Sequence, residues 1–161
     1  MFDFTINGIL NASLPKVFEA FTRPELLIRW SAPGNLSVSQ FHSHCVAGGN
    51  YQMVVQSADG FQQTVVGTYQ DIQHNSSLSF TWRWEDTNDI SKVEINFSEK
   101  ENGATNIRLS QRGFKREQDM HQQQYSWLAC FEKLALVLKD AEQSLPVELE
   151  KYFASQAAAQ L

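Results

Sequence analysis

Six short segments with a two-residue hydrophobic period follow one another through the middle of this chain of 161 residues. The run LSFTWRWE at residues 78–85 shows the pattern, with apolar and polar side chains in strict alternation. Gly, Asn or Asp residues stand between the segments and favour turns. The pattern predicts consecutive antiparallel hairpins in a sheet with one buried face and one wet face. The predicted strands cover residues 36–44, 51–56, 63–72, 78–85, 91–98 and 105–111.

The segment before these strands predicts one more strand and two short helices. Residues 2–10 alternate loosely, which indicates a first strand. Ser13 has the position of a helix N-cap, with a proline tolerated in the first turn. Thr22 and Glu25 have the spacing of a capping box, so we expect a second helix to begin there and to end near Trp30.

Residues 117–139 form the long helical candidate that must cover the apolar face of the sheet. A helix of that length is about 30 Å long, enough to cross a curved sheet. Pro146 predicts a break, followed by a short extra helix at 147–161. We therefore expect a domain at 1–140 and a C-terminal helical extension at 141–161. The apolar side of the extension predicts that it packs on the domain of the same chain or on a second copy in a homodimer. The predicted stripe of the long helix comprises Met120, Gln124, Trp127, Leu128, Phe131, Leu134, Ala135 and Leu138.

Composition and charge exclude several classes of protein. The net charge is −5 and the basic residues are scattered, which argues against a nucleic-acid partner. The longest apolar runs have five residues, far below the ~20 of a membrane span. The N-terminus lacks the features of a signal peptide, and two cysteines make a poor disulfide framework, so we expect a cytoplasmic protein.

Candidate chemical motifs are sparse. His42 and His44 share one face of a strand and Cys45 takes the other, which leaves too few ligands for a metal site. No phosphate-binding glycine loop, nucleophile elbow or zincin helix is present. We therefore predict no metal, no cofactor and no catalytic set; an enzyme would need a cavity acid or base such as His42 or Tyr51.

The order of elements and several short motifs resemble those of one known superfamily. The motifs are ASLPKVFEAFT at 12–22, PEL at 24–26, RW at 29–30, GG at 48–49, GTY at 67–69, LSFTW at 78–82 and WLACF at 127–131. They resemble the START-like, or SRPBCC, superfamily, and within it the branch of heat shock protein 90 ATPase activator homologues. The resemblance implies an α+β helix-grip fold, in which a seven-stranded curved antiparallel sheet wraps a long C-terminal helix and encloses a hydrophobic cavity.

The resemblance, together with strand parity, predicts a ligand cavity rich in aromatic side chains. The expected function is non-enzymatic binding of a small hydrophobic or amphipathic molecule, a lipid included. The alternatives are a cyclase-like or hydratase-like enzyme and a chaperone-associated regulator. The co-chaperone that names the branch has two domains, so the single domain expected here argues against a chaperone contact. The predicted cavity residues are Trp30, Val38, His42, Tyr51, Met53, Phe80, Trp82, Ile95, Trp127, Phe131 and Leu134.

Overall fold

The computed structural model describes the backbone of residues 1–157 and the side chains of residues 1–140. One strand and two short helices precede six further strands and a long helix, in the predicted order. The elements are β1 (Phe2–Leu10), α1 (Leu14–Thr22), α2 (Pro24–Trp30), β2 (Ser37–Ser43), β3 (Asn50–Gln56), β4 (Gln62–Gln73), β5 (Ser77–Trp84), β6 (Ser91–Glu99), β7 (Thr105–Phe114) and α3 (Glu117–Ala157).

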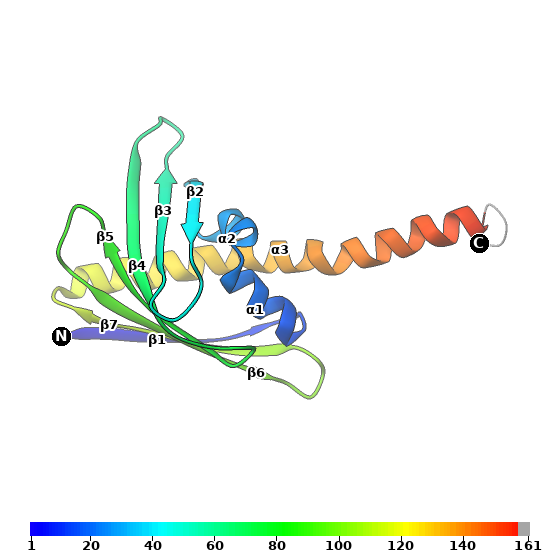
Figure 1. Cartoon of the computed structure of the whole chain (residues 1–161), viewed down its shortest axis with the longest axis horizontal. Coiled ribbons are helices and arrows are strands. Elements are labelled where there is room, and N and C mark those ends of the chain that lie inside the picture. The colour runs from blue at the N-terminus through cyan, green and yellow to red at the C-terminus, as the bar shows by residue number, and fades with distance from the viewer. Residues whose placement is uncertain (158–161) are drawn as a thin grey trace.

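The seven strands form one antiparallel sheet in the order β1-β7-β6-β5-β4-β3-β2. Each strand from β2 to β7 pairs with its neighbours in sequence, as expected for hairpins joined by turns, and β1 pairs with β7 at the edge. Figure 1 shows the sheet sharply bent, with β2, β3 and β4 rising steeply from β1 and β7 while α3 runs along the hollow. The predicted helix-grip architecture is confirmed.

The hydrophobic core fills the hollow between the sheet and the helices. Val93 and Leu109 from the sheet and Leu134 from α3 have no exposed surface. On the other side of the core, the rings of Phe18 and Phe21 of α1 meet the ring of Phe97 edge to face, with centroids 5.3 and 5.2 Å apart. α1 therefore closes the end of the hollow that is nearest β6.

The helix caps differ from the predicted ones. Ser13 does stand at the N-cap of α1, but its side chain makes no cap hydrogen bond. The predicted capping box at Thr22 and Glu25 is wrong, because the N-cap of α2 is Arg23. The Thr22 hydroxyl instead donates back to the Phe18 carbonyl at 2.9 Å, inside α1. Pro24 in the first turn of α2 is compatible with this sharp junction.

The buried stripe of α3 is rotated from the predicted one. Leu128 is 49% exposed and Ala135 is also exposed, whereas Gln123, Cys130 and Val137 are buried. Leu128 and Ala135 lie roughly a third of a turn away from the buried row, since each residue advances the helix by about 100°. The apolar side chains of α3 cover more than one face, so hydrophobicity alone did not fix the rotation of the helix.

α3 continues to Ala157, so the predicted break at Pro146 is wrong. A proline removes one backbone hydrogen bond, but its φ angle is that of a helix, and the helix continues through it. The side chains of residues 141–157 and all of residues 158–161 lie outside the described part, and so does the predicted contact of the extension with a second subunit. No helix in residues 1–157 is long and apolar enough to cross a membrane.

Candidate functional site

A cavity of about 180 Å³ lies between the inner faces of β3, β4 and β5 and the middle of α3, beside the end of α2. Its walls are mainly aromatic and aliphatic, and all four tryptophans of the chain belong to them. The lining residues are Phe21, Leu27, Trp30, Ser31, Pro33, Leu36, Phe41, Tyr51, Met53, Val55, Gln63, Val65, Tyr69, Phe80, Trp82, Trp84, Gln122, Gln123, Ser126, Trp127 and Cys130.

The floor of the cavity is set by the register of three neighbouring strands. Met53 of β3 lies opposite Val65 of β4, and Val65 lies opposite Trp84 of β5, so one row of side chains crosses the sheet toward α3. In a parallel row Tyr51 lies opposite Gly67. A Cβ at Gly67 would collide with the Tyr51 ring and with the Thr81 carbonyl, so the glycine makes room for the ring. The Tyr51 hydroxyl then donates to the Thr81 carbonyl at 2.6 Å.

Two indoles form the wall on the helical side, and both are tied to the scaffold. Trp30 is 1% exposed, and its Nε1 donates to the Ala20 carbonyl at 2.9 Å. Trp127 Nε1 donates to Gln111 Oε1 at 2.8 Å, and Gln111 Nε2 donates to Ser91 Oγ at 2.8 Å. These bonds satisfy the polar edge of each ring and leave its apolar surface toward the cavity. The wall is therefore held in place by buried hydrogen bonds as well as by packing.

The titratable groups of the wall are held in their neutral forms. Burial raises the pKa of Tyr51 well above its usual value, and the neighbouring Tyr69 raises it further. Burial also raises the pKa of Tyr69, with Cys45 as a second cause. Burial raises the pKa of the Cys130 thiol to about 12, although Lys133 opposes this effect. At neutral pH these three groups stay protonated and uncharged.

One polar atom in the wall stands apart from this satisfied set. Ser31 caps the C-terminal end of α2 and lines the cavity. Its Oγ is buried and has no hydrogen-bond partner among the described residues. The backbone N–H of Ser31 donates to the Leu27 carbonyl at 3.1 Å, which fixes the position of the residue. A buried hydroxyl without a partner is unusual in proteins.

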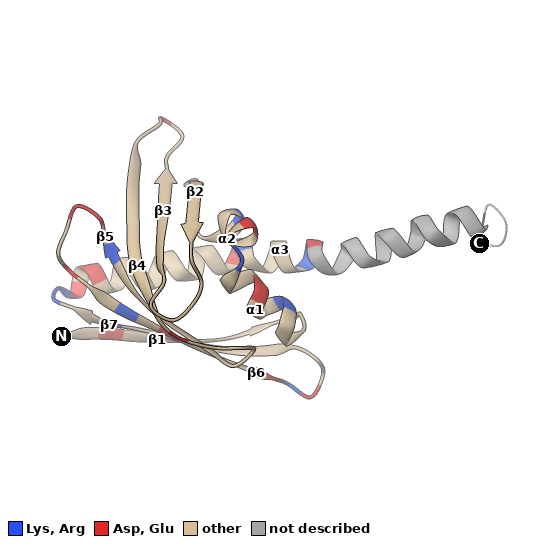
Figure 2. Ribbon diagram, viewed as in Figure 1, with Lys and Arg blue, Asp and Glu red and all other residues tan. Residues whose placement is uncertain are grey.

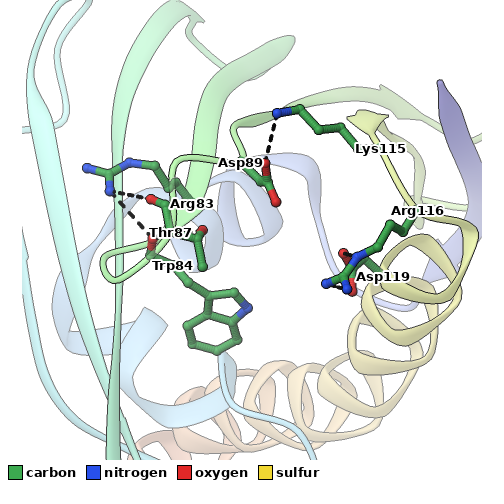
Figure 3. Close-up of polar contacts among 7 residues, drawn as sticks. All are labelled: Arg83, Trp84, Thr87, Asp89, Lys115, Arg116 and Asp119. Carbon is green, nitrogen blue, oxygen red and sulfur yellow. Dashed lines mark hydrogen bonds and ion pairs between the residues drawn. The ribbon is translucent and has the colours of Figure 1, made fainter.

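A smaller hollow of about 100 Å³ adjoins the cavity between the β5–β6 turn and the start of α3. The two spaces share Trp82, Trp84, Gln122 and Gln123, so the hollow has the position of a vestibule. Figure 3 shows charged side chains around it: Lys115 Nζ bridges to Asp89 at 3.0 Å, and Arg116 pairs with Asp119 within its own segment.

The guanidinium group of Arg83 contributes two hydrogen bonds to the β5–β6 turn on this side. Arg83 Nη1 donates to the Thr87 carbonyl at 2.8 Å (Figure 3). It also donates to the Glu85 carbonyl at 3.0 Å. Arg83 does not line the cavity. Its role in the structure is to order the turn beside the vestibule.

Six of the predicted cavity residues line the cavity: Trp30, Tyr51, Met53, Phe80, Trp82 and Trp127. Four others, Val38, Ile95, Phe131 and Leu134, pack in the hydrophobic core without reaching the empty space. They occupy the predicted side of the sheet and helix, but neighbouring side chains fill the volume in front of them. The alternation of side chains along a strand predicts on which face of the sheet a residue lies. It does not predict whether other side chains fill the space above that face.

The placement of His42 in the cavity is wrong. His42 is exposed and lies on the opposite face of the sheet, in a broad depression shared with His44 and Arg83. A β-bulge is the cause: Val38 pairs with Val55 but Gln40 pairs with Val54, so one extra residue reverses the parity of β2. Phe41 takes the inward position instead. Residues 1–140 contain no group of three or more His, Cys, Asp or Glu side chains that could hold a metal ion.

Several lining residues were not predicted. Trp84 continues the same alternation as Trp82, and Val65 and Tyr69 share one face of β4, so parity could have found these three. Cys130 and Gln123 lie in the wall because of how α3 is rotated about its axis, and the sequence did not determine this rotation. Ser31 follows the end of a short helix, and its sequence context gives no signal for a position in the wall.

A bent antiparallel sheet that grips one long helix over an aromatic cavity defines the helix-grip, START-like class of proteins. Within this class, the profile of the family described as Activator of Hsp90 ATPase homolog 1-like protein matches residues 11–139. The chain belongs to this family, and the predicted family relationship is confirmed. No curated protein matches the sequence.

Several solved structures have a similar fold. A crystal structure of a protein from Nitrosomonas europaea has a TM-score of 0.77 and 20% identity, covering 88% of this chain and 96% of that one. A protein from Chromobacterium violaceum has a TM-score of 0.77 and 21% identity, covering 84% and 96%. The solution structure of the AHSA1-like protein from Aeromonas hydrophila has a TM-score of 0.75 and 19% identity, covering 88% and 94%. At these identities the likeness supports the fold alone.

Proposed function

We propose that this protein binds a small hydrophobic or amphipathic molecule in the cavity between the sheet and α3. The observation that carries the proposal is the cavity itself, about 180 Å³ within walls of aromatic side chains. An apolar cavity of about 150 Å³ in another protein stays dry and takes up benzene, so a space of this size is large enough for a guest.

The chemistry of the wall supports binding without catalysis. Tyr51, Tyr69 and Cys130 have raised pKa values because they are buried, so each is protonated at neutral pH. A protonated phenol or thiol is a poor general base. The tethered indoles of Trp30 and Trp127 give rigid apolar surfaces, which suit a guest held by shape and burial.

The first test is native mass spectrometry of freshly purified protein, which should reveal a small molecule that co-purifies and leaves on denaturation. The second is titration with small aromatic compounds followed by intrinsic fluorescence. All four tryptophans line the cavity, so a guest should change the emission directly.

Two neighbouring valines offer a matched pair of variants. Val65 is fully buried and lines the cavity, whereas Val66 points to the opposite face of the sheet. Val65→Phe should fill the space and abolish the fluorescence response, while Val66→Phe should keep it. Cys130→Leu fills the cavity from the α3 side and provides a second blocking variant if Val65→Phe does not fold. Identical responses from the filled and unfilled proteins would refute the proposal.

The proposal extends to the cell compartment. Cys45 and Cys130 are both free thiols, and Cys130 is buried in the core. Free cysteines are typical of proteins in a reducing environment, which supports a cytoplasmic location. Fractionation of cells that express the full chain tests this, and recovery in a membrane or secreted fraction would contradict it.

A further inference from the structure

We propose that the ligand is an uncharged molecule with one aromatic ring and one hydrogen-bonding substituent, and that this substituent meets Ser31 Oγ. This inference rests on the proposed function and narrows it to a chemical class. It is carried by three observations: the charge of the wall, the size of the space and the unpartnered hydroxyl of Ser31.

The wall carries no charge. None of the residues that line the cavity in the described part of the chain is Asp, Glu, Lys, Arg or His. In Figure 2 the charged residues of α3 lie toward the two ends of its described part, and residues 120–131, which pass over the cavity, contain no Lys, Arg, Asp or Glu. An ionised ligand buried here would lose its hydration without gaining a counter-ion. The guest is therefore neutral in its bound form.

The size and shape of the space fit one ring with a small substituent. About 180 Å³ slightly exceeds the 150 Å³ that accommodates benzene, and it is too small for a lipid chain of ordinary length or a fused polycyclic skeleton. Rings approach the space from several directions, among them Trp30, Tyr51, Phe80 and Trp127. Aromatic pairs favour edge-to-face and offset arrangements, and walls at differing angles offer both to an aromatic guest.

Ser31 supplies the polar contact. The polar atoms of Trp30, Tyr51 and Trp127 already bond to the protein, so they are committed to the scaffold. Ser31 lines the same space, and its Oγ is buried without a partner among the described residues. A hydroxyl can donate or accept, so it can bind a ligand hydroxyl, amine or carbonyl. Because α2 fixes the serine backbone, the polar end of the guest faces the α2 side of the cavity.

The test compares phenol, toluene and benzoate on the full-length protein, with tryptophan fluorescence and NMR shift perturbation as readouts. Phenol and toluene have nearly equal size and differ in the hydroxyl, while benzoate adds a charge. In Ser31→Ala the affinity for phenol should fall about fivefold to tenfold, the effect of one lost hydrogen bond. Toluene affinity should not fall, because toluene makes no such bond. Benzoate should bind the native protein at least about a hundredfold more weakly than phenol.

Ser98→Ala is the matched control, since Ser98 is an exposed serine of β6 that does not line the cavity. It should leave the affinities for phenol and toluene unchanged. Ser31→Cys offers a second variant, with a weak donor in the same place and an intermediate loss for phenol. Urea unfolding of each variant verifies that the fold is intact.

The possible failures are distinguishable. Equal phenol affinity in native protein and Ser31→Ala, with both ring compounds still bound, overturns the role of Ser31 and leaves the proposed function standing. Benzoate binding as tightly as phenol overturns the inference of a neutral ligand. A native protein that binds none of the three probes and co-purifies with no small molecule overturns the proposed function and this inference together.

Discussion

Replacing Trp127 by phenylalanine should destabilise the protein far more than the loss of part of a ring suggests. The Trp127 indole donates to Gln111 Oε1 at 2.8 Å, and Gln111 has no exposed surface. Phenylalanine cannot donate, so the buried oxygen loses its partner, which costs about 1–3 kcal/mol. The smaller ring also buries less apolar surface, which adds about 1 kcal/mol. We expect the free energy of unfolding to fall by about 2–4 kcal/mol in total.

A second substitution separates these two contributions. Gln111→Leu in the Trp127→Phe protein removes the unpartnered oxygen and puts an apolar side chain of similar size in its place. Ser91 Oγ loses its contact with Gln111 but still donates to the Trp82 carbonyl at 3.3 Å. We expect the double variant to recover about 1–2 kcal/mol relative to Trp127→Phe alone.

The assay is urea unfolding followed by far-ultraviolet circular dichroism, with the free energies taken from midpoints and slopes. Leu128→Ala is the control, because Leu128 is 49% exposed on the same helix and its loss should change stability by less than about 0.5 kcal/mol. A cost below about 0.5 kcal/mol for Trp127→Phe, or no recovery on adding Gln111→Leu, would refute the structural role of this hydrogen bond.

Three further predictions concern a close contact, a thiol and a turn. Gly67→Ala should cost about 1–3 kcal/mol because its Cβ meets the Tyr51 ring and the Thr81 carbonyl, whereas Gly8→Ala, whose Cβ has ordinary contacts, should be close to neutral in the same unfolding assay. Burial raises the pKa of the Cys130 thiol from 9.0 to about 12, so above pH 9 the unfolded chain loses a proton that the folded chain keeps. The free energy of unfolding should therefore fall by about 1.4 kcal/mol per pH unit between pH 9 and 12. Urea titrations at pH 8 and pH 10 measure this fall, which should be smaller in Cys130→Ala. Arg83→Met should speed amide exchange in residues 85–90 with little change in global stability, and unchanged exchange there would contradict its role in ordering the turn.

The fold was predictable because its signals are local and repeated. Alternation along residues 78–85 and the turn residues between segments indicate hairpins, and the single long amphipathic segment has no other surface to cover. The predicted ends of the strands agree with the observed ends to within a few residues, as in β5 at Ser77–Trp84. The continuation of α3 through Pro146 was missed, because a proline makes a helix break favourable without making it obligatory.

The cavity was predictable only in part, because its walls depend on features with no local signature. Parity placed Tyr51, Met53 and Trp82 correctly, since β3 and the relevant part of β5 have regular pairing. The bulge near Ser39 reversed β2 and exchanged His42 for Phe41, and nothing in the sequence of β2 marks that extra residue. Ser31 enters the wall through the path of the chain after α2, which long-range packing decides.

The anchored indoles also determine how this interior discriminates among molecules. Trp30 and Trp127 cannot swing aside without breaking buried hydrogen bonds, so the space neither collapses when vacant nor widens on demand. Because the cavity walls are already ordered, the protein loses little conformational freedom when a guest binds, so even a compound of few atoms can be bound. The same rigidity sets a strict upper limit on the size of the guest. In a homologous series that grows by one methylene per member, the affinity should be retained up to a threshold size and lost abruptly beyond it.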